Sequence, residues 1–290
     1  MPHNDSEKNM TEYDSTALMN TAMSAARDVS PMLLKAFRSD MNISLKADIH
    51  DLVTEYDGES ERRIKELLFD AYPDSAVVGE EDGTTGEAKL TWYIDPIDGT
   101  ANFARGIAFW CVSIGVTVDG VRVAGAVYDP VGDLMFHADA TGAYLNGEPL
   151  HAKGYTEPER ATMLAHFPMP ADLDADERFA LTEYATLLRA YSAIRNKGSG
   201  ALSLTHVAAG WSDATLNFGT NSWDVAAASF ILEQAGGRYL AYSNGEEVSG
   251  PGTYLIPHYI GVVAGADITV LEPIMIKGSA IRDQHEVTLR

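Results

Sequence analysis

The sequence of 290 residues contains very little cysteine, and its only thiol is that of Cys111. One cysteine cannot form an intrachain disulfide, and this is typical of proteins that live in a reducing cytoplasm. Cys111 lies in the apolar segment FWCVSIGV. We therefore expect it to be a small buried hydrophobe rather than a nucleophile.

Long apolar runs are also lacking. No stretch approaches the roughly 18 consecutive apolar residues that span a bilayer as a helix. The N-terminal segment MPHNDSEKNMTEYDST has neither the basic region nor the apolar region of a signal peptide. The sequence predicts a short disordered lead there, and a cytoplasmic location for the protein.

Positive charge is scarce. The chain has 21 Lys and Arg residues against 42 Asp and Glu residues, which gives a formal net charge of −21. Such a charge repels nucleic acids and anionic membranes, so both are excluded as partners. If the substrate is itself anionic, a cation has to mediate its binding.

The apolar pattern predicts an α/β protein in two parts. Helical spacing indicates helices over 15–38, 57–73 and 177–191, and Pro31 is expected to break the first or to start a second helix. Short strands are expected over 75–79 and 91–95, and the segments within 107–146 indicate an antiparallel meander. Strands and helices then alternate up to a last helix near 267–277. We place a soft boundary near 150–160, between an N-terminal part (1–155) and a C-terminal part (156–290).

The candidate chemistry lies in four acidic stretches. They are KADIHDLVTEYD (46–57), GEED (79–82), DPIDGT (95–100) and WDVAAASFILEQAGG (223–237). In the third stretch Asp95 ends a strand and the next residue, a proline, turns the chain sharply. That turn can bring the carboxylates of Asp95 and Asp98 and the carbonyl of Ile97 to one side.

The next two residues add a second feature. Gly99 and Thr100 offer backbone N–H groups at a predicted helix start, which is a ready anion site. Taken singly, each acidic motif has another explanation: Asp98-Gly99 as a turn, Asp224 as a helix N-cap and Glu80-Glu81-Asp82 as a solvated loop. The functional interpretation depends on their convergence.

Convergent carboxylates need a cation. Two carboxylates about 4 Å apart repel each other by roughly 4 kcal/mol at an effective dielectric constant of about 20. Oxygen ligands without clustered His or Cys indicate Mg²⁺ rather than zinc. Several Mg²⁺ ions beside an anion site indicate phosphoryl chemistry.

At this point the sequence resembles a known family, that of the Mg²⁺-dependent, lithium-sensitive inositol monophosphatases. The resemblance rests on GEED, WYIDPIDGTANF and WDVAAASFILEQAGG, in the order and approximate spacing of that family. It extends through DLVTEYD and GSGALSLTHVAAGWSDA over nearly the whole chain. It implies a layered αβαβα sandwich of the inositol monophosphatase and fructose-1,6-bisphosphatase type, usually a homodimer.

The resemblance also implies residue roles. Two to three Mg²⁺ ions would be held by Glu80, Asp95, Asp98, Asp224 and the carbonyl of Ile97. Thr100, hydrogen-bonded to Asp57, would position and help to deprotonate the attacking water, while Gly99 and Thr100 would hold the phosphate. Glu81 and Asp51 would act in or next to the second metal shell, and Lys46 would balance charge from a mobile loop.

The substrate side departs from the family pattern. Where inositol-phosphate hydrolases carry a glutamate that reads ring hydroxyls, seven residues before Asp224, this sequence has Asn217. An amide both donates and accepts hydrogen bonds and carries no charge, so it favours a different substrate pattern. The triplet Gly198-Ser199-Gly200 also differs, because an alanine commonly ends it. His206, on a mostly apolar helix, is expected to be a hydrogen-bonded core histidine rather than a catalytic one.

The sequence therefore predicts a phosphomonoesterase that hydrolyses a small polyol or sugar phosphate, with inositol 1-phosphate as the first candidate. Histidinol phosphate, fructose 1,6-bisphosphate, NADP and 3′-phosphoadenosine 5′-phosphate stay open as substrates on the same site. The alternative from another class is a non-enzymatic role, for example as an interaction partner of the transcription machinery.

Overall fold

The computed structural model describes residues 13–45 and 52–289. Most of the predicted N-terminal lead falls outside these residues. Lys46 and Asp51, two of the predicted site residues, do so as well.

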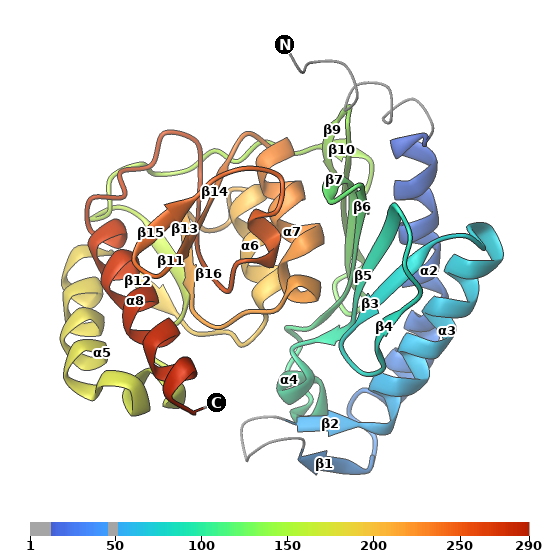
Figure 1. Cartoon of the computed structure of the whole chain (residues 1–290), viewed down its shortest axis with the longest axis horizontal. Helices are drawn as coiled ribbons and strands as arrows, with labels where there is room; N and C mark the ends of the chain where they lie inside the picture. The colour runs from blue at the N-terminus through green and yellow to red at the C-terminus, as the bar shows by residue number, and fades with distance from the viewer. Residues whose placement is uncertain (1–12, 46–51, 290) are drawn as a thin grey trace.

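Five layers make up the molecule, and Figure 1 shows them from right to left. Helices α2 (Ser15–Ala36) and α3 (Glu55–Ala71) cover one face of an eight-stranded sheet. Helices α6 (Gly200–Ala208) and α7 (Ser222–Gln234) form the middle layer, followed by a six-stranded sheet. Helices α5 (Pro170–Ala190) and α8 (Leu271–Leu289) cover the far side. The predicted αβαβα sandwich is confirmed.

The first sheet has the strand order β10-β9-β8-β7-β6-β5-β3-β4. Its strands are β3 (Ala76–Gly79), β4 (Gly83–Thr85), β5 (Leu90–Asp98), β6 (Cys111–Val118), β7 (Val121–Asp129), β8 (Leu134–Asp139), β9 (Gly142–Leu145) and β10 (Glu148–Pro149). Neighbours from β5 to β10 pair antiparallel, which confirms the predicted meander, and β3 runs parallel to β5. A small hairpin of β1 (Ile43–Leu45) and β2 (Leu52–Thr54) precedes α3.

Strand β5 extends three residues beyond its predicted end. Its pairing with β6 is regular up to Asp95 and shifts before Asp98. Pro96 lies inside the shift, where a residue without an N–H group costs the ladder least. Asp95 and Asp98 therefore lie on the same strand, but the register shift between them changes the direction of the Asp98 side chain relative to a regular strand. The short helix α4 (Thr100–Arg105) follows directly.

The prediction that Pro31 breaks the first helix is wrong. Helix α2 runs continuously through Pro31. The proline is exposed, whereas the opposite face buries Ala26, Val29 and Leu33 in the core beneath the sheet. Burial of that face outweighs the missing hydrogen bond and the crowding that a proline causes in a helix.

The second sheet has the order β12-β11-β13-β16-β14-β15. Its strands are β11 (Thr162–His166), β12 (Ala193–Arg195), β13 (Ala214–Asn217), β14 (Arg238–Ser243), β15 (Glu246–Val248) and β16 (His258–Val262), and a 3₁₀ turn η1 (Thr253–Leu255) precedes β16. The chain passes between the sheets from residue 149 to 162, and the division at 155 stays a prediction. Helix α5 starts seven residues before its predicted start and kinks at Asp176, while α8 ends twelve residues later than predicted.

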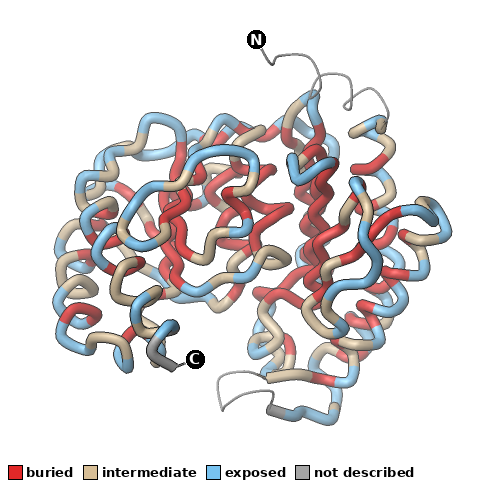
Figure 2. Tube along the Cα trace, in the orientation of Figure 1, coloured by how far each residue is buried: buried red, intermediate tan, exposed pale blue. Residues whose placement is uncertain are grey.

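Helix α7 packs on the first sheet at close range. A side chain on Gly115 of β6 would meet the Cβ atom of Ala226 at 2.7 Å, so only glycine fits there. The residues of α7 that face the sheets are fully buried, as the red middle of Figure 2 shows. This contact brings the first turn of α7 next to the irregular end of β5.

No helix within residues 13–45 or 52–289 is both long enough and apolar enough to cross a membrane.

Candidate active site

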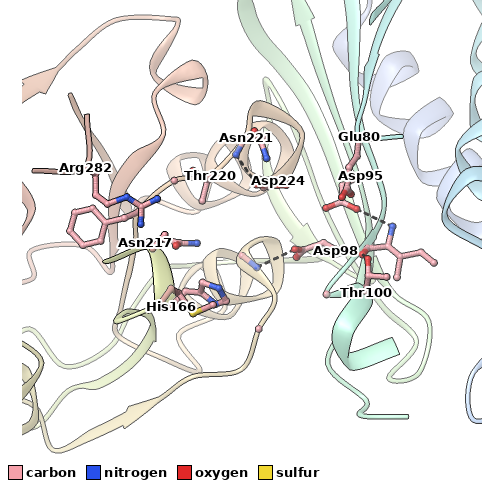
Figure 3. Close-up of a pocket in the computed structure, with 18 residues that line it drawn as sticks. Glu80, Asp95, Asp98, Thr100, His166, Asn217, Thr220, Asn221, Asp224 and Arg282 are labelled. Atoms are coloured by element: carbon pink, nitrogen blue, oxygen red, sulfur yellow. Dashed lines mark hydrogen bonds between the residues drawn. The ribbon is translucent and has the colours of Figure 1, made fainter. Parts of the chain in front are cut away.

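A cavity of about 370 Å³ opens where the first sheet, α6, α7 and the second sheet meet. Its wall brings together residues that are up to 202 positions apart in the sequence, from Glu80 to Arg282. Figure 3 shows the acidic residues Glu80, Asp95 and Asp98 on the side of the first sheet, and Asn217, Thr220 and Arg282 across from them. The described residues of the wall are Glu80, Asp95, Ile97, Asp98, Gly99, Thr100, His166, Met169, Ala171, Gly198, Gly200, Asn217, Phe218, Gly219, Thr220, Asn221, Asp224 and Arg282.

Asp95 is the most strongly perturbed acid of the cavity. Only 2% of its surface is exposed, and its Oδ1 atom accepts a hydrogen bond of 3.0 Å from the N–H group of Ile97. Burial raises the pKa of Asp95 well above its usual range, and the nearby carboxylates of Glu80, Asp98 and Asp224 raise it further. Four acids thus share one electrostatic environment, which favours a bound cation.

Asp98 ties the first sheet to helix α6. Its carboxylate accepts hydrogen bonds from the hydroxyl of Ser199 and from the N–H groups of Gly200 (3.2 Å) and Ala201 (2.8 Å). Burial raises the pKa of Asp98, and these hydrogen bonds oppose that effect.

Cys111 lies against the same carboxylate, with 3.6 Å between its Sγ atom and Oδ2 of Asp98. The thiol is fully buried, which confirms the predicted environment. Burial, followed by the charge of Asp98, raises the pKa of the Cys111 thiol well above its usual value. The thiol therefore stays protonated and is no nucleophile.

Thr100 and Asp57 form the predicted pair. The Thr100 hydroxyl lies 2.9 Å from Oδ1 of Asp57 and 2.9 Å from the carbonyl oxygen of Ile97. The other Asp57 oxygen accepts hydrogen bonds from the N–H group and hydroxyl of Thr54, in a capping box at the start of α3. Burial raises the pKa of Asp57. The capping box fixes the carboxylate that orients the threonine.

The loop that carries Glu80 rests on a buried ion pair that sequence reasoning missed. Glu61 of α3 is fully buried, and its carboxylate accepts hydrogen bonds from the N–H groups of Glu81 (2.8 Å) and Asp82 (3.0 Å). Lys65, one turn later, pairs with Glu61 at 2.7 Å. In the sequence, Glu61 and Lys65 are ordinary charged positions of an amphipathic helix, so their burial could not be predicted from the neighbouring residues.

Asp224 enters the cavity from the first turn of α7. Its Oδ2 atom accepts a 2.7 Å hydrogen bond from the N–H group of Asn221, which is the N-cap of α7, so Asp224 is the third helical residue of a capping box and not the N-cap that its simpler explanation assumed. It also lines the cavity with the other acids. Its role as a metal ligand stays a prediction.

The structure brings together most of the predicted site. Ten predicted residues lie on the wall itself: Glu80, Asp95, Ile97, Asp98, Gly99, Thr100, Gly198, Gly200, Asn217 and Asp224. Asp57 and Ser199 lie directly behind it as partners of Thr100 and Asp98. Glu81 is not part of the wall as described, and its role stays a prediction.

Several wall residues were not predicted. His166 and Arg282 are the most polar of them, and Thr220 and Asn221 complete the rim before α7. Burial lowers the pKa of His166, so its imidazole is neutral at pH 7. No motif marks residue 282, because only the packing of α8 against the second sheet brings it to this place.

The donor set fits a hard cation such as Mg²⁺. The acids of the cavity and the Ile97 carbonyl offer oxygen ligands, and the neutral imidazole of His166 is the one histidine among the described wall residues. Within the described part of the chain, no three His, Cys, Asp or Glu side chains form a ready-made metal cluster. Asp98 and Asp224 instead turn one or both oxygens toward N–H groups of helices α6 and α7.

The sequence model of the inositol monophosphatase family matches residues 14–275. The chain belongs to this family. Members of the inositol monophosphatase family act on small phosphorylated substrates and depend on metal ions, typically Mg²⁺. The resemblance inferred from the acidic motifs is thereby confirmed.

The named relatives include inositol monophosphatases and Nus factors. The chain is 34% identical over 237 residues to inositol monophosphatase 1 of Bos taurus, covering 78% of this chain and 84% of that protein. It is 33% identical over 233 residues to the Nus factor SuhB of Pasteurella multocida, covering 79% and 86%. Among solved structures, the suhB protein of Bartonella henselae superposes with a TM-score of 0.77 at 27% identity, over 92% of this chain and 99% of that one.

Proposed function

We propose that this protein is a Mg²⁺-dependent phosphomonoesterase that hydrolyses a small polyol or sugar phosphate. The observation that carries the proposal is the convergence of four acids and the Thr100–Asp57 pair on one cavity. Glu80, Asp95, Asp98, Asp224 and the Ile97 carbonyl would hold two to three Mg²⁺ ions. When bound, these ions supply positive charge for the phosphate and lower the pKa of a water molecule.

The chain's own residues orient the reactants. Because the Thr100 hydroxyl donates its proton to Asp57 or to the Ile97 carbonyl, its lone pairs are left to accept a hydrogen bond from a water molecule. Asp57 is held rigidly by Thr54, so the acceptor direction is fixed. The backbone N–H groups of Gly99 and Thr100 lie at the start of α4 and would contact the phosphate.

Inositol 1-phosphate is the first substrate to test, followed by histidinol phosphate, fructose 1,6-bisphosphate, NADP and 3′-phosphoadenosine 5′-phosphate. Asn217 stands where inositol-reading members carry a glutamate, and therefore the substrate pattern is expected to differ from theirs. A homodimer in the cytoplasm completes the proposal, with no nucleic-acid or membrane partner.

The second candidate is a regulatory role in transcription, favoured by the relatives named Nus factor SuhB. The experiment that tests the first proposal is phosphate release from this substrate panel with Mg²⁺. Release with a clear preference within the panel supports the phosphatase. No release from any substrate, together with capture of a transcription protein in a pull-down by the full chain, supports the regulatory role.

A further inference from the structure

The wall of the cavity carries one cation, Arg282 of helix α8, and no other Lys or Arg among the described wall residues. Its side chain is only 12% exposed. Figure 3 shows Arg282 across the cavity from Glu80 and Asp95. The cavity is therefore electrostatically polarised, with acids at the end that would bind Mg²⁺ and a buried guanidinium at the other end.

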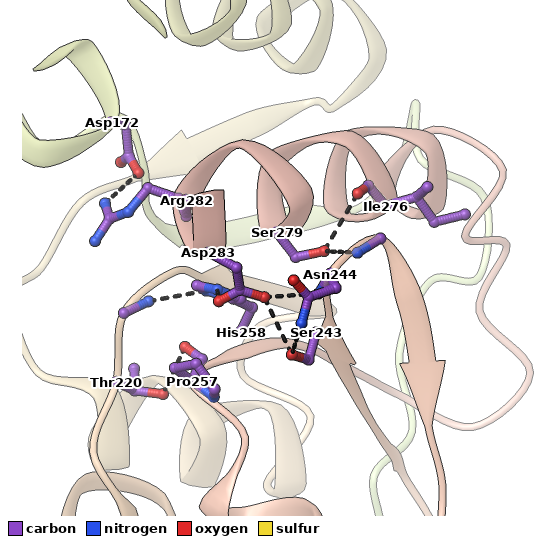
Figure 4. A network of polar contacts seen from close by, with 12 residues as sticks. Asp172, Thr220, Ser243, Asn244, Pro257, His258, Ile276, Ser279, Arg282 and Asp283 are labelled. Atoms are coloured by element: carbon purple, nitrogen blue, oxygen red, sulfur yellow. Dashed lines mark hydrogen bonds and ion pairs between the residues drawn. The ribbon is translucent and has the colours of Figure 1, made fainter. Parts of the chain in front are cut away.

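An ion pair with Asp172 holds the guanidinium in place. Nη1 of Arg282 donates to Oδ1 of Asp172 at 2.7 Å, as Figure 4 shows. The other oxygen of Asp172 accepts a 2.7 Å hydrogen bond from the N–H group of Met169, in the first turn of α5. The first turn of α5 therefore fixes the carboxylate that orients the guanidinium on the cavity wall.

The opposite side of Arg282 is fixed by the rim loop. Gly219 has a φ of +73°, and a side chain there would meet Nη2 of Arg282 at 2.7 Å. The Gly219 N–H group donates to Nδ1 of His258 at 3.1 Å, and Nε2–H of His258 donates to Asp283 at 3.1 Å (Figure 4). Two consecutive residues of α8 thus have linked roles: Arg282 supplies the guanidinium, and Asp283 holds the loop beside it through His258. The guanidinium is therefore preorganised for a ligand.

The residue between the two ends is uncharged. Asn217 is buried on the wall, and its Oδ1 atom has no hydrogen-bond partner among the described residues. An amide oxygen in that position suits a substrate hydroxyl, because a buried acceptor without a partner is costly. In contrast to a glutamate, it does not repel an anion bound beside it.

We propose that Arg282 binds a second anionic group of the substrate, a phosphate or a carboxylate, while the phosphate to be hydrolysed lies at Glu80, Asp95 and Asp98. This inference rests on the proposed phosphatase function and narrows its substrate class. It favours sugar bisphosphates and phosphorylated sugar acids over inositol 1-phosphate and histidinol phosphate, which have one anionic group.

The competing explanation is purely structural, namely that Arg282 only pins α8 to α5 through Asp172. The test is a ratio of kcat/KM values between matched substrates with Mg²⁺. One arm compares fructose 1,6-bisphosphate with fructose 1-phosphate and fructose 6-phosphate. The other arm compares 2-phosphoglycerate with glycerol 2-phosphate, which has a hydroxymethyl group in place of the carboxylate. The two arms distinguish a phosphate from a carboxylate as the second group.

The variants keep the fold testable. The double variant Asp172→Asn/Arg282→Gln replaces the buried ion pair by a neutral amide pair, and Arg282→Lys keeps the charge but not the planar fork. Lys277→Gln, an exposed cation on the same helix, controls for the loss of one positive charge. Unfolding curves report whether each variant is folded.

We expect the two-anion preference to fall about ten- to a hundredfold in the double variant, as for the loss of a charge-assisted hydrogen bond, and to persist in Lys277→Gln. An equal loss for one-anion and two-anion substrates, or an unchanged ratio in both arms, overturns the assignment. Release from no substrate by the wild type contradicts the phosphatase proposal instead. In that case, calorimetric titration of fructose 1,6-bisphosphate and fructose 6-phosphate into the wild type and the double variant tests Arg282 alone. A lower ratio of bisphosphate to monophosphate affinity in the double variant supports the role of Arg282, and an unchanged ratio contradicts it.

Discussion

The buried carboxylate of Asp98 combines a structural role with a proposed role in metal binding. It accepts hydrogen bonds from Ser199, Gly200 and Ala201, and it lies against the Cys111 thiol while lining the cavity. The same atoms that fasten β5 to α6 are those proposed to bind the metal. Substitution at this residue therefore has to separate charge from hydrogen bonding.

Asp98→Asn makes that separation. The amide keeps one acceptor oxygen for Ser199 and the N–H group of Ala201, loses the longer bond from the N–H group of Gly200, and removes a charge whose burial is unfavourable, so the free energy of unfolding is expected to change by no more than about 1–2 kcal/mol. Turnover with Mg²⁺ is expected to fall at least about a hundredfold, because a metal ligand loses its charge. Urea unfolding and phosphate release measure the two effects. Activity close to that of the wild type would contradict the proposed ligand role.

Asn217 is the residue at which we expect specificity to be adjustable. Asn217→Glu restores a charged acceptor for ring hydroxyls, and it places a further negative charge beside the acids of the cavity. We expect the kcat/KM ratio of inositol 1-phosphate to fructose 1,6-bisphosphate to rise about tenfold or more. Asn217→Gln is the control, since it changes length without charge. An unchanged profile in Asn217→Glu would show that this residue does not read the substrate.

At the scale of elements, the GEED loop depends on its contact with α3. A Cβ atom on Gly79 would lie 2.3 Å from Oε1 of the buried Glu61, which holds the N–H groups of the loop. Gly79→Ala therefore forces Glu61 or the loop to move, and we expect a loss of about 1–3 kcal/mol in the free energy of unfolding together with lower turnover.

Gly58→Ala is the matched control for that substitution. Gly58 lies inside α3 with nothing within 4 Å of its Cβ position, so alanine there is expected to stabilise the protein by about 0.5–1 kcal/mol. Urea denaturation of both variants measures the difference. Equal stabilities for the two alanine variants would refute the account of the Glu61 contact.

Helix α6 contributes an acid-sensitive contact. His206 is half-buried and packs against the rings of Phe109, Phe136 and Trp211, and burial lowers its pKa to about 4; among the described residues these ring contacts take the place of the hydrogen bond expected for a core histidine. The unfolded chain, with an ordinary pKa near 6.5, binds the proton first as the pH falls. Protonation therefore favours unfolding between about pH 6.5 and pH 4.

His206→Phe removes this linkage. Between pH 7 and pH 4.5 we expect the wild type to lose about 2 kcal/mol more unfolding free energy than His206→Phe, and His151→Gln, at an exposed position, to follow the wild type. Guanidinium unfolding at several pH values gives the comparison. Parallel pH profiles for wild type and His206→Phe would show that the imidazole does not sit in the low-pKa environment described.

The sequence could predict site residues that lie in recognisable motifs, but not those that only tertiary packing brings to the site. Asp95, Asp98 and Thr100 lie in one short motif, so chain geometry over a few residues places them together, whereas the convergence of Glu80 and Asp224 on them was predicted from the resemblance to the family. Glu61, His166 and Arg282 reach the site only through tertiary packing, and nothing in their neighbouring residues announces it. The early start of α5 escaped notice because its first turns, PADLDA, are separated from the regular apolar pattern of 177–191 by the kink at Asp176.

At the scale of the whole molecule, the site is a junction between two sheets. The first sheet and α3 supply the acids and the Thr100–Asp57 pair, whereas α7, α8 and the second sheet supply Asp224, Asn217 and Arg282. This division matches the chemistry proposed, with the reaction on one side and substrate selection on the other. It also accounts for a protein of net charge −21 that binds phosphate, since the proposed Mg²⁺ ions and Arg282 supply positive charge locally.

The measurement that tests this account most directly is the Mg²⁺ dependence of phosphate release by the wild-type chain. After treatment with a chelator, we expect no release from the preferred substrate, saturable recovery as Mg²⁺ is added back, and inhibition by millimolar Li⁺ as in the family it resembles. Loss of Li⁺ inhibition alone would count against the usual metal arrangement. Phosphate release at the same rate with chelator and with Mg²⁺ would contradict the central claim that the acids of this cavity act through bound metal.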